Sequence, residues 1–310
     1  MLARVGDGDR RAQRLVRRRR RALAAGIAAA VVVAAGVGVG VAVARTAGSV
    51  PGEADMPWPD AGVAAIAVDD REAFGPDAEA ARPMASLTKL VTALVVLDAA
   101  PLTAGEDGPV YVLDAMDAAI TAQEQSADGV SAALPAGTPA TERHLLELML
   151  VASANDAARS LARHVFGDEA TFISRARVWL EARGLGEVTM VDAAGMGAAN
   201  AASSRDLLSL GRLAMADTTI ASIVVMPAVT KDARLGSEQL RSTNSLLGRF
   251  GVDGLKTGHT DPAGYTTLFT APLDAGSNRR VFGVILGAPS AAQRDTDAAL
   301  LLGHVRAASR

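Results

Sequence analysis

MASLTKLVTALVVL, at residues 84–97, is an apolar stretch that opens with a serine and a lysine three positions apart. Its leucines recur at helical spacing and no Gly or Pro interrupts it, so the pattern predicts a helix that starts near Ser86. Residues three apart share one face of a helix, which brings the amine of Lys89 within reach of the Ser86 hydroxyl. A lysine with a depressed pKa can act as the base that a serine nucleophile needs. By itself the pair is commonplace, because a capping serine beside a solvated lysine gives the same pattern.

Strand patterns flank a helix-rich region of the chain. An apolar run at 61–68 has the composition of a buried strand, and runs near Leu255, at 265–270 and at 280–286 resemble hairpin strands. These patterns predict an α+β fold in which one sheet is assembled from both ends of the chain. Apolar periodicity predicts further helices at residues 141–151, with Thr141 as N-cap, 156–165, 171–183, 203–216 and 291–307.

The first 44 residues carry a membrane-topology signal. Eight arginines lie between residues 10 and 21, and residues 22–44 that follow contain no charged side chain. As a helix, residues 22–44 would extend roughly 34 Å, enough to cross a hydrocarbon core of about 30 Å. The arginines predict that the N-terminus stays in the cytoplasm and that the rest of the chain is exported. A cleaved signal peptide is the alternative, because Ala42-Val43-Ala44 has the small residues of a cleavage site.

Four segments follow from these patterns. Residues 1–21 are expected to form an Arg-rich cytoplasmic segment, 22–44 a transmembrane anchor, 45–59 a linker broken up by Gly and Pro, and 60–310 one exported domain. The last segment is long enough to bury a sizeable core without disulfides, which agrees with the absence of Cys from the chain.

Composition and charge argue against several function classes. The net charge is −3 and the pI is about 5.9, so no overall basic field favours binding to nucleic acid. The lack of Cys removes thiol nucleophiles and thiolate metal sites. The four histidines include no pair at the i, i+4 spacing of a helical zinc site. We therefore expect no metal, no cofactor and no nucleic-acid partner.

Two further tripeptides carry polar side chains that could share a cleft with Ser86. Ser153-Ala154-Asn155 follows the predicted helix at 141–151, although serine and asparagine are also ordinary helix caps. Lys256-Thr257-Gly258 lies in a predicted strand, where a cation and a hydroxyl would suit a carboxylate and Gly258 would let a ligand approach the backbone. A solvated lysine at a strand end is the simpler interpretation of that tripeptide alone.

The conjunction of the three motifs changes these interpretations. They occur in the order SxxK, SxN and KTG, separated by 67 and 103 residues, each in a fitting secondary-structure context. Over about residues 57–290 the chain resembles the low-molecular-mass D-alanyl-D-alanine carboxypeptidases, which are penicillin-binding proteins of serine peptidase family S11. The resemblance extends beyond the motifs to Thr243-Asn244-Ser245 and Ala263-Gly264-Tyr265. It is weaker at Ala176-Arg177 and Arg183-Gly184, where the family usually has Met-Asn and Leu-Gly.

This resemblance implies a fold and an activity for residues 60–310. The fold would be of the β-lactamase and DD-peptidase type, an antiparallel sheet flanked by helices with a helical subdomain. The activity would be removal of the terminal D-alanine from peptidoglycan stem peptides through an acyl-enzyme on Ser86, with β-lactams as inhibitors. With the N-terminal anchor, this predicts a single-pass protein of the bacterial cell membrane.

The resemblance also assigns roles to single residues. It implies Ser86 as nucleophile, Lys89 as general base and Ser153 as proton relay. The residues implied to bind substrate are Asn155, Lys256, Thr257, Gly258 and His259. Backbone N–H groups of Ser86 and His259 would form the oxyanion hole, and the charge of Lys256 would keep Lys89 neutral.

Three alternatives stay open. A DD-endopeptidase that cleaves peptidoglycan crosslinks would use the same catalytic groups. A class A β-lactamase would need a glutamate for deacylation in a Glu-x-x-Leu-Asn setting, and residues 187–191 do not fit that pattern. A catalytically silent wall-binding protein could keep the fold, although its motifs would not need to be intact.

Overall fold

The computed structural model describes residues 50–310 except 104 and 277. The predicted cytoplasmic segment, the predicted anchor at 22–44 and residues 45–49 of the predicted linker lie outside the described residues. Among the helices that are described, no single one is long and apolar enough to cross a membrane. Two of them, Ser204–Ala216 and Thr218–Val224, reach that length and hydropathy only as a pair, bent by 100°.

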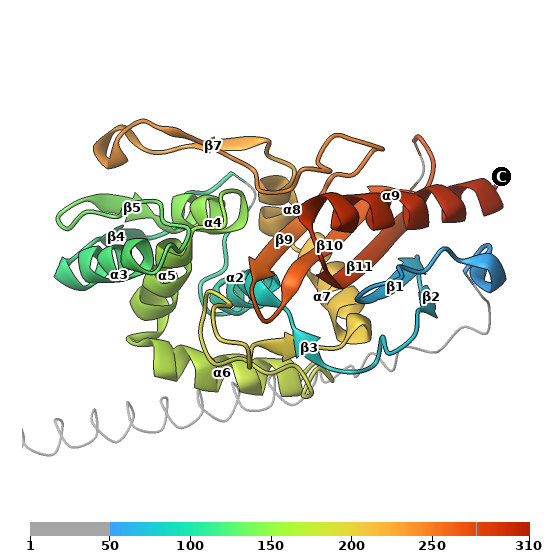
Figure 1. Ribbon diagram of the computed structural model, residues 1–310. Helices are drawn as coiled ribbons and strands as arrows, with labels where there is room; N and C mark the ends of the chain where they lie inside the picture. Colours follow the sequence, from blue (N-terminus) through green and yellow to red (C-terminus); the bar gives the residue numbers. More distant parts are fainter. Residues whose placement is uncertain (1–49, 104, 277) are drawn as a thin grey trace, which may run out of the picture. The chain divides into compact units, whose positions relative to one another are not determined.

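A five-stranded antiparallel sheet contains strands from both ends of the chain, as predicted (Figure 1). The second N-terminal strand forms one edge and the first of the C-terminal strands forms the other. In spatial order the strands are β2 (Arg71–Phe74), β1 (Val63–Val68), β11 (Arg280–Ala288), β10 (Gly264–Pro272) and β9 (Gly254–Thr260). Val63 pairs with Leu286 and Val68 with Val281, so the first strand is inserted beside the last.

Both faces of the sheet are covered, which explains why the sequence of β1 is apolar throughout. Alternate residues of a strand point to opposite faces. Ala65 and Ala67 accordingly pack with α2 (Thr88–Ala99) and α7 (Ser204–Ala216), whereas Ala64 and Ile66 belong to a second cluster with α9 (Ala291–Ala308). The sheet therefore lies between two helical layers.

The α9 side of the core includes part of the predicted linker. Val50 and Met56, on either side of the short 3-10 helix η1 (Glu53–Asp55), are 1% and 7% exposed and pack in the same cluster as Ile66 and Leu301. Residues 50–56 thus contribute to the hydrophobic core.

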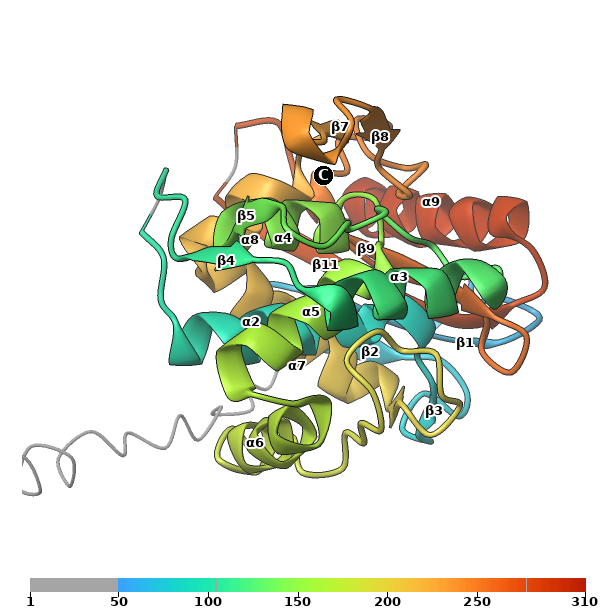
Figure 2. The ribbon, with the colours of Figure 1, turned by 90° about the vertical axis from the view of Figure 1, so that its left-hand side faces the viewer.

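A helical subdomain fills the region between the early and late strands (Figure 2). The helices predicted at 141–151, 156–165 and 171–183 are confirmed. The helices of this region are α3 (Ala115–Ser126), α4 (Glu142–Leu150), α5 (Asn155–Phe166), α6 (Glu169–Glu181) and α8 (Thr218–Val224). It also contains three short strand pairs: β3 (Arg82–Pro83) with β6 (Ala201–Ala202), β4 (Val110–Val112) with β5 (Pro139–Thr141), and β7 (Ala228–Thr230) with β8 (Gln239–Arg241). The 3-10 helix η3 (Ala233–Leu235) lies between β7 and β8.

Local sequence explains where these helices start. Thr141 caps α4 as predicted, since its hydroxyl accepts the N–H of His144. Helix α3 was not predicted, yet Asp114 and Asp117 form a capping box at its start. Its buried face carries Thr121 and Glu124 in place of an apolar stripe, so hydrophobic periodicity gives no signal there.

Candidate active site

Ser86 and Lys89 lie where the 3-10 helix η2 (Ala85–Leu87) runs into α2. Lys89 Nζ is 2.9 Å from Ser86 Oγ, so the predicted pairing along one helix face is present. Lys89 has no exposed surface and Ser86 is 9% exposed, which leaves the hydroxyl as the accessible member of the pair. Ala85, just before the serine, has φ of 48°, a left-handed conformation that is uncommon for residues other than glycine.

The remaining partners of Lys89 come from far along the chain. Its amine contacts Asn155 Oδ1 at 2.8 Å and the backbone carbonyl of Ala194 at 2.6 Å. Both atoms can only accept hydrogen bonds. A neutral amine has two N–H groups and one lone pair, so donation to these two acceptors directs the lone pair at the Ser86 hydroxyl. That is the arrangement required to remove the hydroxyl proton.

Burial sets the protonation of Lys89. Loss of water lowers the pKa of this amine from its ordinary 10.5 to about 7, although the carboxylates of Asp192, Glu124 and Asp156 act in the opposite direction. Burial is the largest cause of the lowered pKa of Lys89, and the like-charge repulsion expected between Lys89 and Lys256 is present as a further interaction. Lys256 itself is only 1% exposed, and its pKa is lowered well below the usual range by burial, then by the charges of Lys89 and Arg294.

Ser153 connects the second and third motifs. It lies between α4 and α5 with φ of 64°, and its Oγ accepts a 2.9 Å hydrogen bond from Lys256 Nζ. The N-cap of α5 is Ala154, so Ser153 is not the helix cap that the tripeptide alone would suggest. Ser153 is therefore a second hydroxyl with its own buried amine, and that amine interacts electrostatically with Lys89.

The third motif lies on β9, at the edge of the sheet. Lys256 Nζ also donates to the backbone carbonyl of Thr257 at 2.8 Å. The Thr257 hydroxyl contacts the Thr243 carbonyl at 3.1 Å and the Thr243 hydroxyl at 3.0 Å. Through these contacts the Thr243-Asn244-Ser245 segment supports the strand that carries the third motif.

Gly258 lies against the start of the serine helix. The approach of a ligand to its backbone stays a prediction, and the structure shows a second reason for a glycine here. A Cβ atom on Gly258 would lie 2.8 Å from Ser86 N and 2.7 Å from Thr266 Oγ1. The missing side chain thus lets β9 approach the start of the serine helix. Beyond it, the exposed ring of His259 stacks on Tyr265 with centroids 4.0 Å apart.

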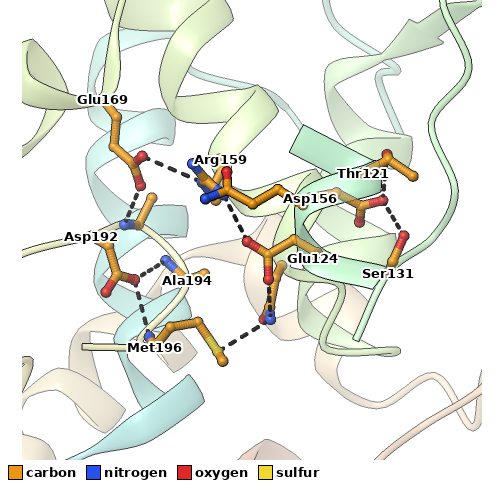
Figure 3. A network of polar contacts seen from close by, with 12 residues as sticks. Thr121, Glu124, Ser131, Asp156, Arg159, Glu169, Asp192, Ala194 and Met196 are labelled. Atoms are coloured by element: carbon orange, nitrogen blue, oxygen red, sulfur yellow. Dashed lines mark hydrogen bonds and ion pairs between the residues drawn. The ribbon is translucent and has the colours of Figure 1, made fainter. Parts of the chain in front are cut away.

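The loop at 192–197 was missed by the sequence analysis. The Asp192 carboxylate accepts the backbone N–H groups of Ala194, Gly195, Met196 and Gly197, at 2.9, 2.5, 3.1 and 2.8 Å. Figure 3 shows the bonds to Ala194 and Met196. Gly195 has φ of 86°, and a Cβ there would lie 2.0 Å from the Ala85 carbonyl. The Ala194 carbonyl, which holds Lys89, could not be predicted from the sequence, because every residue has a backbone carbonyl.

Arg294, near the start of α9, is a further cation at the site. Its side chain is 6% exposed and its guanidinium contacts Asp295 and, at 3.1 Å, Ser245 Oγ. The charge of Arg294 contributes to the lowered pKa of Lys256. The amine of Lys256 on β9 and the guanidinium of Arg294 on α9 thus interact electrostatically.

The site is recognised by the chemistry of its residues. A groove of about 600 Å³ beside α3, α5 and α6 is lined by Gln123, Arg159 and Glu169 and contains none of the predicted site residues. Within the described residues, no group of three or more His, Asp or Glu side chains could hold a metal ion.

Comparison with known proteins supplies the family. The model of the peptidase S11 family, described as D-alanyl-D-alanine carboxypeptidase, matches residues 74–290, which include all three motifs. The chain belongs to this family. It is therefore a serine-type D-Ala-D-Ala peptidase, a hydrolase, as the resemblance implied.

Relatives within the S11 family divide between two activities. A D-alanyl-D-alanine carboxypeptidase of Mycobacterium tuberculosis is 31% identical over 69% of this chain and 69% of that protein. D-alanyl-D-alanine endopeptidases of Pseudomonas aeruginosa and Escherichia coli are each 28% identical, over 62% and 67% of this chain and 62% and 64% of those proteins. The chain thus spans somewhat less than two thirds of the length of these endopeptidases.

Solved S11-like structures share the fold. A Streptomyces DD-transpeptidase matches with a TM-score of 0.72 and 25% identity, covering 81% of this chain and 99% of that one. A penicillin-binding protein of Listeria monocytogenes, solved in its ampicillin-bound form, matches with a TM-score of 0.63 and 29% identity, covering 80% and 98%. The predicted α+β DD-peptidase fold is confirmed for the described domain; the predicted membrane helix is outside it.

Proposed function

We propose that this chain is a D-alanyl-D-alanine carboxypeptidase that removes the terminal D-alanine of peptidoglycan stem peptides through an acyl-Ser86 intermediate. The observation that carries the proposal is the environment of Lys89. Two obligatory acceptors and complete burial give an amine with a pKa of about 7 whose lone pair faces the Ser86 hydroxyl.

In the acylation step, Ser86 Oγ attacks the carbonyl carbon between the two D-alanines while Lys89 takes the hydroxyl proton. The oxyanion that forms is stabilised by the backbone N–H groups of Ser86 and His259. The close approach of Gly258 to Ser86 N supports this pairing, because it brings the two segments together. One oxyanion donor is commonly worth about 3 kcal/mol in the transition state.

The leaving amine of the terminal D-alanine needs a proton. We propose that Ser153 supplies it and that Lys256, which donates to Ser153 Oγ at 2.9 Å, replaces the proton. The proton that Lys89 took from Ser86 passes on to Lys256, so that both amines return to their starting states. Water then attacks the acyl carbon while Lys89 takes one of its protons, and that proton goes to Ser86 Oγ as the acyl–oxygen bond breaks.

The terminal carboxylate would bind beside β9. Lys256 would supply an amine, Thr257 a hydroxyl and Arg294 a guanidinium to this carboxylate. Binding would turn the Thr257 hydroxyl from Thr243 to the carboxylate. A β-lactam carries a comparable carboxylate next to a reactive carbonyl, so we propose that penicillins acylate Ser86 by the same route.

The endopeptidase is the second candidate, favoured by the near-equal identity to relatives of both names. Release of free D-alanine from a pentapeptide would be compared with cleavage of a crosslinked muropeptide dimer, using one preparation of the full chain. Preferential D-alanine release supports the carboxypeptidase, and preferential dimer cleavage would replace it with the endopeptidase. If labelled penicillin fails to react with Ser86, the catalytically silent alternative is correct.

We also propose that residues 22–44 anchor the protein in the bacterial cell membrane, with residues 60–310 outside the cytoplasm. The Arg-rich segment before an uncharged apolar stretch supports this topology. Alkaline extraction of membranes tests the anchor, and the mass of the isolated protein distinguishes it from a cleaved signal peptide.

A further inference from the structure

Asn155 is held in one orientation by its surroundings. It is 2% exposed, its Oδ1 accepts from Lys89 at 2.8 Å and its Nδ2 donates to Glu124 Oε2 at 2.9 Å. The two ends of an amide have opposite hydrogen-bonding character. If the amide were reversed, Nδ2 would face the Lys89 amine and Oδ1 would face a carboxylate. Because a carboxylate only accepts, Glu124 excludes the reversed state.

Glu124 continues into a chain of charged groups (Figure 3). Its Oε1 accepts from Arg159 Nη1 at 2.8 Å, and Arg159 Nε lies 3.4 Å from Glu169 Oε2. The other oxygen of Glu169 accepts the backbone N–H of Ala193 at 3.0 Å. Ala193 immediately precedes Ala194, whose carbonyl holds Lys89. Both acceptors of the Lys89 amine are therefore supported by one network, and Arg159 compensates the buried charge of Glu124.

The second N–H of Asn155 faces a weak partner. It lies 3.2 Å from Met196 Sδ, and Met196 is 42% exposed. A thioether is a poor acceptor compared with a peptide carbonyl. A substrate carbonyl can displace the Met196 sulfur from this N–H without loss of a strong hydrogen bond, whereas the bond to Glu124 remains.

We propose that Glu124 is a positioning residue for acylation: it fixes the Asn155 amide so that its oxygen holds Lys89 and its second N–H is presented to the substrate. Through Arg159 and Glu169 it also steadies the Ala194 carbonyl. The proposal rests on the proposed function, since it concerns the same acylation of Ser86.

A pH profile separates this role from a merely structural one. The charged groups that face Lys89 are Glu124 from α3, Asp156 from α5, Asp192 from the 192–197 loop and Lys256 from β9. The negative charge of Glu124 raises the pKa of Lys89. Glu124→Gln should therefore lower that pKa and move the acid limb of the acylation profile to lower pH, an effect that loosened packing alone would not produce.

The experiment measures the rate of Ser86 acylation by a labelled penicillin in the full chain, from about pH 5 to pH 9. We expect Glu124→Gln to slow acylation at the plateau by roughly 10- to 100-fold, because the reacting groups lose their fixed geometry. Glu124→Asp keeps the charge, but its side chain is too short to hold both Asn155 and Arg159. Its acylation rate should therefore lie between those of the wild type and Glu124→Gln, and the acid limb of its pH profile should stay where it is in the wild type. Asp98→Asn, which removes an exposed carboxylate paired with Arg183, is the matched control and should match the wild type.

A double-mutant cycle tests whether Glu124 acts through Asn155. With Asn155→Ala as background, Glu124→Gln should cost less than threefold. Two results overturn the proposal. One is that Glu124→Gln lowers the acylation rate equally in the wild-type and the Asn155→Ala backgrounds. The other is that Glu124→Gln alone changes neither the acylation rate nor the acid limb of its pH profile. If Glu124→Gln does not fold, as judged by its thermal transition, the same cycle with Glu124→Asp decides the question. A wild-type chain that does not react with penicillin would instead refute the proposed function, so the two failures are distinguishable.

Discussion

The amine of Lys89 lies 2.9 Å from the hydroxyl oxygen of Ser86, with no exposed surface on the lysine. A fully solvated lysine at this distance would be charged at neutral pH and could not take a proton. Burial removes that obstacle, since it lowers the pKa of Lys89 to about 7. Lys89 is therefore both close enough to the Ser86 hydroxyl and sufficiently often uncharged to accept its proton.

Ser86→Ala should abolish covalent labelling by penicillin and reduce D-alanine release by at least about 1000-fold, because no other group forms the acyl-enzyme. The thermal transition should stay close to that of the wild type, since the change removes one oxygen from a nearly buried side chain. Labelling at a different serine, identified by mass spectrometry of peptides, would contradict the assignment.

The acylation rate should rise with pH and level off above about pH 7. Lys89 must be unprotonated to accept the Ser86 proton, and with its pKa at about 7 the neutral fraction falls about tenfold for each pH unit below that value. Single-turnover acylation at a series of pH values measures this. A rate that is flat from about pH 5 to pH 8 would show that Lys89 is not the base.

Arg294→Met should raise the KM for a D-Ala-D-Ala peptide by roughly 10- to 100-fold, the range expected for loss of a hydrogen bond to a charged group. The value of kcat should change much less, because Arg294 stands beside the carboxylate and not at the reacting carbon. Removal of its charge should also raise the pKa of Lys256. Arg183→Met, on the surface, is the control; an unchanged KM for Arg294→Met would place the carboxylate elsewhere.

Gly258→Ala should slow acylation by roughly 100-fold, because its Cβ would press on Ser86 N at 2.8 Å and misplace the nucleophile. We also expect a loss of about 1–3 kcal/mol in unfolding free energy from overpacking. Gly303→Ala is the control, since Gly303 is exposed on α9 with nothing within 4 Å of a new Cβ. It should be neutral for acylation and stabilising by up to about 1 kcal/mol. Equal behaviour of both variants would mean that β9 and the serine helix are not in close contact.

Sequence patterns predicted the elements whose burial is apolar and periodic. The helix after Ser86 and the strand at 63–68 pack apolar side chains against the core, so their patterns reveal them. Helix α3 escaped prediction because Asp117, Thr121 and Glu124 are buried on it as polar partners. Residues Val50 and Met56 escaped because Gly and Pro around them suggested a linker, and it is the tertiary structure that buries them in a cluster with the sheet and α9.

The sequence by itself determined the three motifs, their order and spacing, and hence the family and the candidate nucleophile. It could not determine why Lys89 serves as a base. The amine depends on Asn155 Oδ1, which is 66 positions away, and on the Ala194 carbonyl, which is 105 positions away. Its pKa depends on exclusion of water by several segments and on charges from three of them. Burial and directed hydrogen bonds between distant segments exist only once the chain is folded, so tertiary structure decided the chemistry of the site.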